Sequence, residues 1–181
     1  PPPAASNILD FLCRHRYRLL GALALFTVAD VAWAALSYLV YPGYLDHGES
    51  SVAVISWRLL GGIPAFPAID DPQRVANIYG PLTYVVHALA FALFGPSLAA
   101  GKAAGVAAAI LVPVAVFFAQ RRRGIEAALV ATAFAAAVVL VHVPTSIWNR
   151  PDSFLALVAV IAVWIANVAD PGRAEWTKSI M

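Results

Sequence analysis

The chain has 181 residues, of which 61% are hydrophobic and 12% are charged, and its formal net charge is +2. This apolar content exceeds what a soluble domain needs to fill its core, so it argues against a soluble protein and indicates an integral membrane protein. The basic residues are scattered over loops, which argues against a nucleic-acid partner. The single cysteine, Cys13, excludes an internal disulfide and a cysteine-based metal site.

The sequence predicts an all-α fold, because its apolar stretches are long and do not alternate with a period of two. Four stretches come close to the ~20 residues that cross ~30 Å of hydrocarbon. We therefore expect residues 1–181 to form a single polytopic membrane helical bundle, and we expect this module to be part of a longer protein. The predicted spans are about 19–41, 98–119, 124–143 and 153–169.

The segment after the first span, residues 42–79, is longer than a connector needs to be. Loops of this length usually carry function or fold on their own. Apolar side chains recur on one face of 50–62, which predicts a helix lying on the membrane and capped by Ser50 or Ser51.

A further apolar stretch, residues 80–95, is short for a span, since sixteen residues make about 24 Å of helix. It either enters and leaves the same leaflet or forms a fifth span. Without a fifth span, eight Lys and Arg residues lie on the cytoplasmic side and four lie outside; with it, five lie inside and seven outside. The positive-inside rule favours four spans, a cytoplasmic N-terminus and, we expect, a bacterial inner membrane. The eight are Arg14, Arg16, Arg18, Arg121, Arg122, Arg123, Arg173 and Lys178.

Two loops with charged residues then open on one outer face. One carries Asp46 and Glu49, and the other carries Arg150 and Asp152. Carboxylates at a membrane surface can act on a substrate whose reactive head is in water while its tail stays in lipid. The alternative is structural, because Glu49 and Asp152 also stand at helix starts, where the helix dipole favours a carboxylate by ~0.3 to 1 kcal/mol.

Asp30 falls near the middle of the first predicted span. An unpaired carboxylate there costs roughly 2.5 to 3.5 kcal/mol on insertion scales, so it is expected to face protein or water. It serves either a proton or ion pathway, as in a transporter fragment, or a hydrogen bond to a neighbouring helix.

The order of these features resembles the N-terminal part of the GT-C superfamily of membrane glycosyltransferases, especially the protein mannosyltransferase and aminoarabinose transferase-like branch. The chain departs from many members in one respect, since they place the two acids side by side, whereas here two residues separate them. The matching pieces are Asp46-His47-Gly48-Glu49, residues 50–62, Tyr79-Gly80-Pro81-Leu82, Phe94-Gly95-Pro96-Ser97, Lys102, Arg121-Arg122-Arg123 and Arg150-Pro151-Asp152.

The resemblance implies transfer of a sugar from a polyprenyl-phosphate donor to an acceptor hydroxyl at the outer membrane face. Asp46 or Glu49 would take the acceptor proton. Lys102 and Arg150 would bind the donor phosphate, and Asp152 would orient Arg150, position the acceptor or hold a divalent metal together with Asp46. The expected partners are the lipid-linked donor and membrane lipids. The alternatives are a non-catalytic membrane subunit of a larger complex and a transporter fragment.

Overall fold

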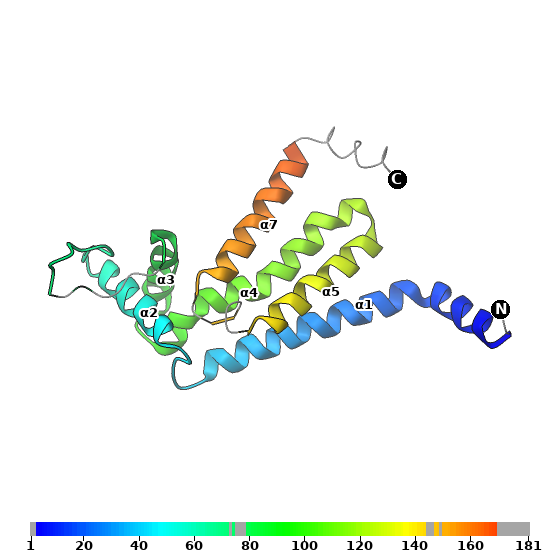
Figure 1. Ribbon diagram of the computed structural model, residues 1–181, viewed down its shortest axis with the longest axis horizontal. Helices are drawn as coiled ribbons and strands as arrows, with labels where there is room; N and C mark the ends of the chain where they lie inside the picture. The colour runs from blue at the N-terminus through cyan, green and yellow to red at the C-terminus, as the bar shows by residue number, and fades with distance from the viewer. Residues whose placement is uncertain (1–2, 73, 75–78, 144–146, 149, 170–181) are drawn as a thin grey trace.

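The part of the chain that the computed structural model describes is all-helical, as predicted, with no strand in it. The described residues are 3–72, 74, 79–143, 147, 148 and 150–169, so the predicted cytoplasmic residues Arg173 and Lys178 lie outside them. The elements in chain order are α1 (Pro3–Val40), α2 (His47–Leu60), α3 (Pro81–Phe94), α4 (Leu98–Gln120), the 3-10 turn η1 (Arg121–Arg123), α5 (Ile125–Val141) and α7 (Asp152–Ala169) (Figure 1).

The long helices form a bundle in which α1 packs against α4 and α5, and α4 also packs against α5 and α7. The helices α2 and α3 pack on each other at one end of this bundle, and α3 contacts α4 (Figure 1). Small residues in the bundle core allow helix axes to approach closely. The buried core residues are Val31, Ala35, Tyr38, Val106, Ala109, Val112, Ala136, Val139 and Ile147.

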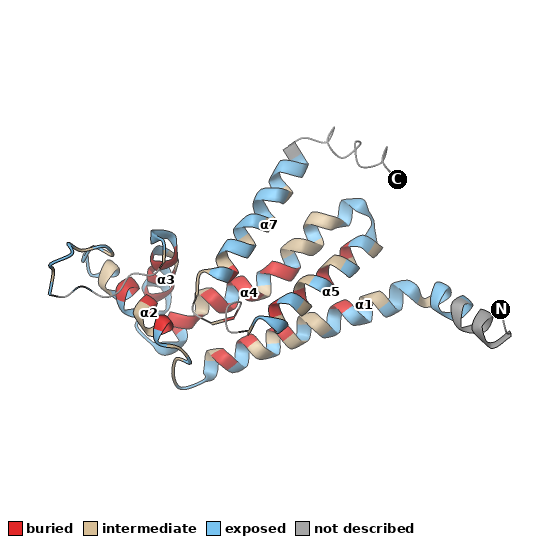
Figure 2. Ribbon diagram, viewed as in Figure 1, coloured by how far each residue is buried: buried red, intermediate tan, exposed pale blue. Residues whose placement is uncertain are grey.

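Two helical segments in the described residues are long and apolar enough to cross a membrane, Asp10–Val40 and Leu98–Arg123. Only 17% and 33% of their apolar windows are buried, so neither is enclosed by the rest of the described chain. Figure 2 shows the same pattern, with exposed residues along much of α1 and α7. Both α5 and α7 are apolar but shorter, so the structure by itself supports two candidate spans.

The predicted surface helix begins earlier than expected, and its predicted cap was wrong. It starts at His47, and its N-cap is Asp46, not Ser50 or Ser51. Asp46 and Glu49 form a capping box, in which each side chain accepts a hydrogen bond from the backbone N–H of the other residue. The two serine hydroxyls instead donate to the carbonyl oxygen of His47, at 2.8 and 3.2 Å.

The ambiguous stretch 80–95 forms the helix α3, which begins with Pro81 at its first turn and ends before Gly95. Gly95 has φ = 75°, a left-handed conformation that glycine adopts without strain. Fourteen residues make about 21 Å of helix, which is short of the ~30 Å hydrocarbon core. The length of α3 therefore agrees with a segment that does not cross the bilayer.

The contact between α4 and the chain before α7 depends on Gly105. A methyl group there would lie 2.9 Å from the carbonyl oxygen of Trp148 and 3.3 Å from that of Ile147. Backbone atoms on the facing segment cannot move aside as a flexible side chain would. We therefore predict that Gly105→Ala destabilises the bundle by about 1 to 3 kcal/mol and lowers the midpoint of thermal unfolding in detergent, followed by circular dichroism.

Gly21→Ala in α1 is the matched control, since a methyl group at Gly21 meets no atom within 4 Å. Alanine favours the helix over glycine, so this variant should unfold at the wild-type temperature or above it. A Gly105→Ala protein as stable as Gly21→Ala would contradict the close packing described here.

Candidate functional site

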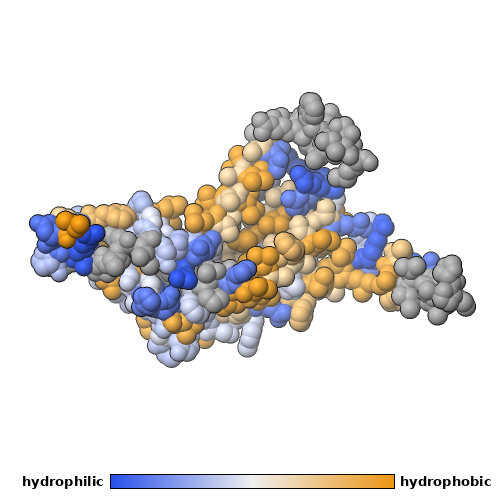
Figure 3. All heavy atoms as spheres, viewed as in Figure 1, coloured by the Kyte–Doolittle hydropathy of each residue, from blue (hydrophilic) through white to orange (hydrophobic). Residues whose placement is uncertain are grey.

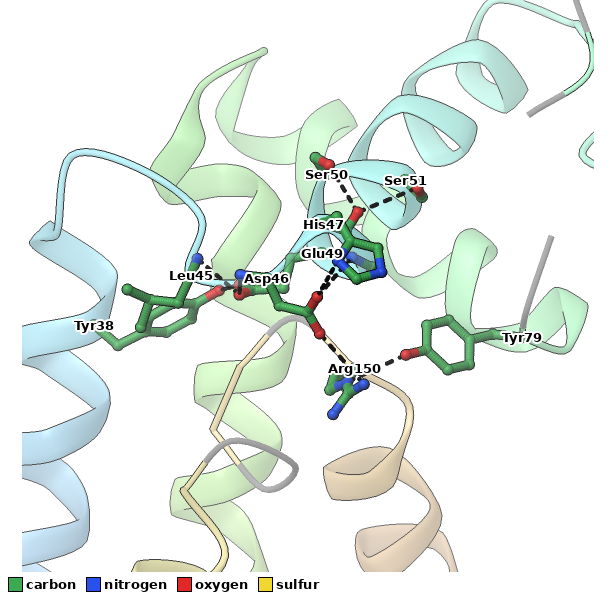
Figure 4. A network of polar contacts seen from close by, with 10 residues as sticks. Tyr38, Leu45, Asp46, His47, Glu49, Ser50, Ser51, Tyr79 and Arg150 are labelled. Atoms are coloured by element: carbon green, nitrogen blue, oxygen red, sulfur yellow. Dashed lines mark hydrogen bonds and ion pairs between the residues drawn. The ribbon is translucent and has the colours of Figure 1, made fainter. Parts of the chain in front are cut away.

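The candidate site lies at the end of the bundle where α1 stops and where α2 and α7 begin (Figure 4). Its centre is an ion pair between Arg150 Nη2 and Asp46 Oδ2, 3.3 Å apart. These residues are far apart in the sequence and come from the two loops that were expected to share one face. The structure therefore brings the two predicted charged loops into direct contact.

Besides its contact with Arg150 and its part in the capping box, the carboxylate of Asp46 has two further contacts. Its Oδ1 accepts a hydrogen bond from the backbone N–H of Gly48 at 3.2 Å and lies 3.0 Å from Nδ1 of His47. The hydrogen bond from Gly48 holds the pKa of Asp46 below its usual value, and the charges of His47 and Arg150 add to this effect. Asp46 is therefore ionised at neutral pH, with 18% of its side chain exposed.

Glu49 is completely buried beneath the start of α2. Its Oε1 accepts hydrogen bonds from the backbone N–H groups of Leu45 at 2.9 Å and Asp46 at 2.8 Å. Its Oε2 accepts a hydrogen bond from the hydroxyl of Tyr38 on α1. Both carboxylate oxygens thus hold the loop that carries Asp46, and neither faces water.

Lys102 is also completely buried, although it was expected to bind a phosphate. Its Nζ donates to the carbonyl oxygens of Tyr38 at 2.9 Å and Tyr41 at 2.7 Å, where α1 ends. The ammonium group lies 4.5, 5.4 and 5.9 Å from the ring centroids of Tyr38, Tyr41 and Tyr44. A cation at a helix C-terminus satisfies carbonyls that lack helical partners, and aromatic faces also attract it. Lys102 therefore joins α4 to the end of α1.

Arg150 is held from two sides. Its Nε donates to the hydroxyl of Tyr79 at 3.2 Å, while Nη2 faces Asp46 (Figure 4). The hydrogen bond to Tyr79 raises the pKa of Arg150, and the charges of Asp46 and Asp152 raise it further. Asp152 is exposed in the first turn of α7. Arg150 is thus the group that links Asp46, Tyr79 and the start of α7.

Tyr38 and Tyr79 are the site residues to which the sequence interpretation assigned no role. Tyr79 stood in a recognised motif, two residues before Pro81 at the start of α3, but a tyrosine at a helix entrance has many possible functions. Tyr38 sits in an apolar span, and its pairing with Glu49 depends on where the chain turns after α1. The sequence alone contains no signal for that turn.

A divalent metal was expected at Asp46 and Asp152. Among the described residues, no group of three or more His, Cys, Asp or Glu side chains is arranged to hold a metal ion. The guanidinium of Arg150 already lies against Asp46, so a divalent ion would have to displace it. The expectation of a divalent metal at Asp46 and Asp152 stays a prediction.

Asp30 does not belong to this site. It is partly exposed on α1, about 15 Å of helix from Val40. The expectation that it faces a proton pathway or a neighbouring helix stays a prediction.

Comparisons of the chain with protein-family models, with curated proteins and with solved structures found no match. The resemblance to membrane glycosyltransferases thus depends on the motifs and their order alone. The structure adds one observation that bears on function, which is the contact between the motifs that carry Asp46 and Arg150.

Because Glu49 is completely buried, we expect its side chain to hold the loop in position and not to contact a substrate. Glu49→Gln keeps one carbonyl oxygen that accepts from the backbone N–H groups of Leu45 and Asp46, and its NH2 group can donate to the hydroxyl oxygen of Tyr38. We therefore predict a folded protein with near wild-type stability. Glu49→Ala removes these acceptors and should cost about 1 to 3 kcal/mol for the buried groups left without partners. Thermal unfolding of both variants tests this, and equal loss of stability in both would show that the charge of Glu49, not its hydrogen bonds, stabilises the loop.

Proposed function

We propose that this chain is part of a membrane glycosyltransferase that moves a sugar from a polyprenyl-phosphate donor to an acceptor hydroxyl at the outer membrane face. The observation that carries the proposal is the pairing of Asp46 with Arg150 at the water-facing end of apolar helices. A carboxylate beside a guanidinium offers a proton acceptor and a phosphate ligand within one small site. The order of sequence motifs supports the same function.

The proposed arrangement in the membrane has α1, α4, α5 and α7 as spans, with the N-terminus in the cytoplasm of a bacterium. The helix α2 lies on the outer surface of the inner membrane, and α3 enters the outer leaflet. In this arrangement Asp46 and Arg150 lie at the boundary between lipid and water. A donor with a lipid tail and a soluble acceptor can meet there.

In the reaction, Asp46 takes the proton of the acceptor hydroxyl, and the acceptor oxygen forms a bond to the anomeric carbon of the sugar. The bond between that carbon and the donor phosphate oxygen breaks, and its electron pair stays on the phosphate. Arg150 stabilises the negative charge that develops there, because a guanidinium can contact two phosphate oxygens at once. The proton on Asp46 later returns to water.

The ion pair also regulates the basicity of Asp46 in this mechanism. While Arg150 faces Asp46, the carboxylate has a lowered pKa and is a weak base. A donor phosphate that draws Arg150 toward itself removes one of the charges that lower this pKa. Glu49 and Lys102 keep the loop and the end of α1 in place while Arg150 moves, which gives them positioning roles and leaves Asp46 as the base.

Asp46→Asn tests the proposed base. Asparagine is as good an N-cap as aspartate, so the variant should keep the helix α2 and unfold near the wild-type temperature. It cannot accept a proton, and sugar transfer by the reconstituted full-length protein should fall by about 10²-fold to 10⁴-fold. Asp70→Asn makes the same chemical change at an exposed acid outside the contacts of the site, so it is the control and should keep its activity. An active Asp46→Asn protein would remove the proposed base.

The membrane arrangement has a separate test in a Cys13→Ser background. Cysteines introduced by His47→Cys and Asp152→Cys, at two exposed positions, should react with a membrane-impermeant thiol reagent on intact cells. A cysteine introduced by Arg123→Cys, at the exposed turn between α4 and α5, should react only after lysis. If positions 47 and 152 label from opposite sides, the shared site cannot exist in the membrane.

A non-catalytic membrane subunit is the second candidate, favoured by the exposed apolar side chains of α7. Leu155, Val163 and Ile165 are 57% to 61% exposed and require lipid or another helix to cover them. This candidate predicts that Asp46→Asn leaves the function of the complex unchanged, so the same variant distinguishes the two.

A further inference from the structure

A second charged region lies on the bundle away from the candidate site. The basic segment of α1 and the turn η1 lie close together, because Arg16 Nε is 2.5 Å from Glu126 Oε1 at the start of α5. Six arginines outnumber the two nearby acids, Asp10 and Glu126, so this region is positive, and all six arginines are exposed. We call it the arginine belt, and its residues are Arg14, Arg16, Arg18, Arg121, Arg122 and Arg123.

The two regions differ sharply in charge. In contrast to the arginine belt, the described charged residues around α2, α3 and the start of α7 nearly balance, with five acids and four bases. These are Asp46, Glu49, Asp70, Asp71 and Asp152 against Arg58, Arg74, Lys102 and Arg150. The belt therefore presents the main positive field of the described chain.

The geometry of the belt spreads its charges around the bundle instead of focusing them on one point. Alternate residues of a helix are turned by about 200°, so Arg14 and Arg18 face away from Arg16, which contacts α5. The three arginines of η1 extend this ring at the turn between α4 and α5. Such an arrangement contacts several separate anions and does not enclose a single small one.

Apolar and aromatic residues border the belt. Phe11 and Leu19 on α1 and Ile125 on α5 are 44% to 54% exposed. The guanidinium of Arg121 lies 5.0 Å from the ring centroid of Phe118, and that of Arg16 lies 5.0 Å from the ring of Tyr17. In Figure 3 hydrophilic residues near the turn between α4 and α5 adjoin the orange surface of the helices. This combination suits a ligand with an anionic head and an apolar tail.

We propose that the arginine belt binds the headgroups of anionic phospholipids. The guanidinium groups contact the lipid phosphates at the membrane surface, and the bordering apolar side chains contact the acyl chains. Free soluble anions would gain nothing from these apolar borders. The inference depends on the chain lying in a bilayer, but it does not depend on sugar transfer.

Native mass spectrometry of the detergent-purified full-length protein tests this inference. The protein is titrated at low salt with phosphatidylglycerol or with phosphatidylcholine of the same acyl chains. The wild type should bind phosphatidylglycerol at least about tenfold more tightly, since each arginine near an anionic headgroup contributes about fivefold in affinity. Equal affinity for the two lipids would overturn the proposal.

Two double variants localise the effect. Arg122→Gln with Arg123→Gln should lower the affinity for phosphatidylglycerol by up to about 30-fold. The matched control, Arg58→Gln with Arg74→Gln, removes the same charge near α2 and should change it less than about twofold. Equal losses in both would overturn the assignment to the belt, as would full displacement of the lipid by millimolar inorganic phosphate. Circular dichroism checks that both variants keep their helices. If either variant fails to fold, the preference of the wild type for phosphatidylglycerol over phosphatidylcholine still tests the proposal.

Discussion

The arrangement of the candidate site depends on the buried joint that Glu49 and Lys102 make with the end of α1. Glu49 joins the loop before α2 to Tyr38, and Lys102 joins α4 to the carbonyl oxygens of Tyr38 and Tyr41. The burial of these two polar side chains is tolerated because each has several hydrogen-bond partners. Loss of the hydrogen bonds of either Glu49 or Lys102 would release the loop that carries Asp46. The position of the partly exposed Asp46 therefore depends on two side chains that are completely buried.

The arginine belt and the candidate site differ in charge and in how their charged residues are arranged. The nearly neutral region holds a carboxylate and a guanidinium in contact, and the basic region carries charge spread around the helices. Between them, the small and apolar residues of α1, α4 and α5 pack closely, as the contact at Gly105 illustrates. In the proposed membrane arrangement, the two regions lie on opposite surfaces of the bilayer.

The helices were predictable because the apolar stretches are long and lack a period of two, and their ends follow proline, glycine and capping residues. The start of α2 was misjudged because several residues near 46–51 can cap a helix, and the capping box between Asp46 and Glu49 decided among them. Charge and loop position were enough to predict that the loops of Asp46 and Arg150 share one face, but the direct pairing of these two side chains came from the structure. The burial of Glu49 and Lys102 was not predictable, since it arises from how α1 and α4 cross, which no local pattern encodes.

One carboxylate, that of Asp46, both caps α2 and faces Arg150. A proton that binds to it weakens an acceptor of the first helical turn and the ion pair in the same event. The carbonyl oxygen of a protonated Asp46 can still accept from the N–H of Gly48, so the cap survives while the charge that faces Arg150 is lost. Protonation of Asp46 therefore acts on the contact between the two loops more than on α2 itself.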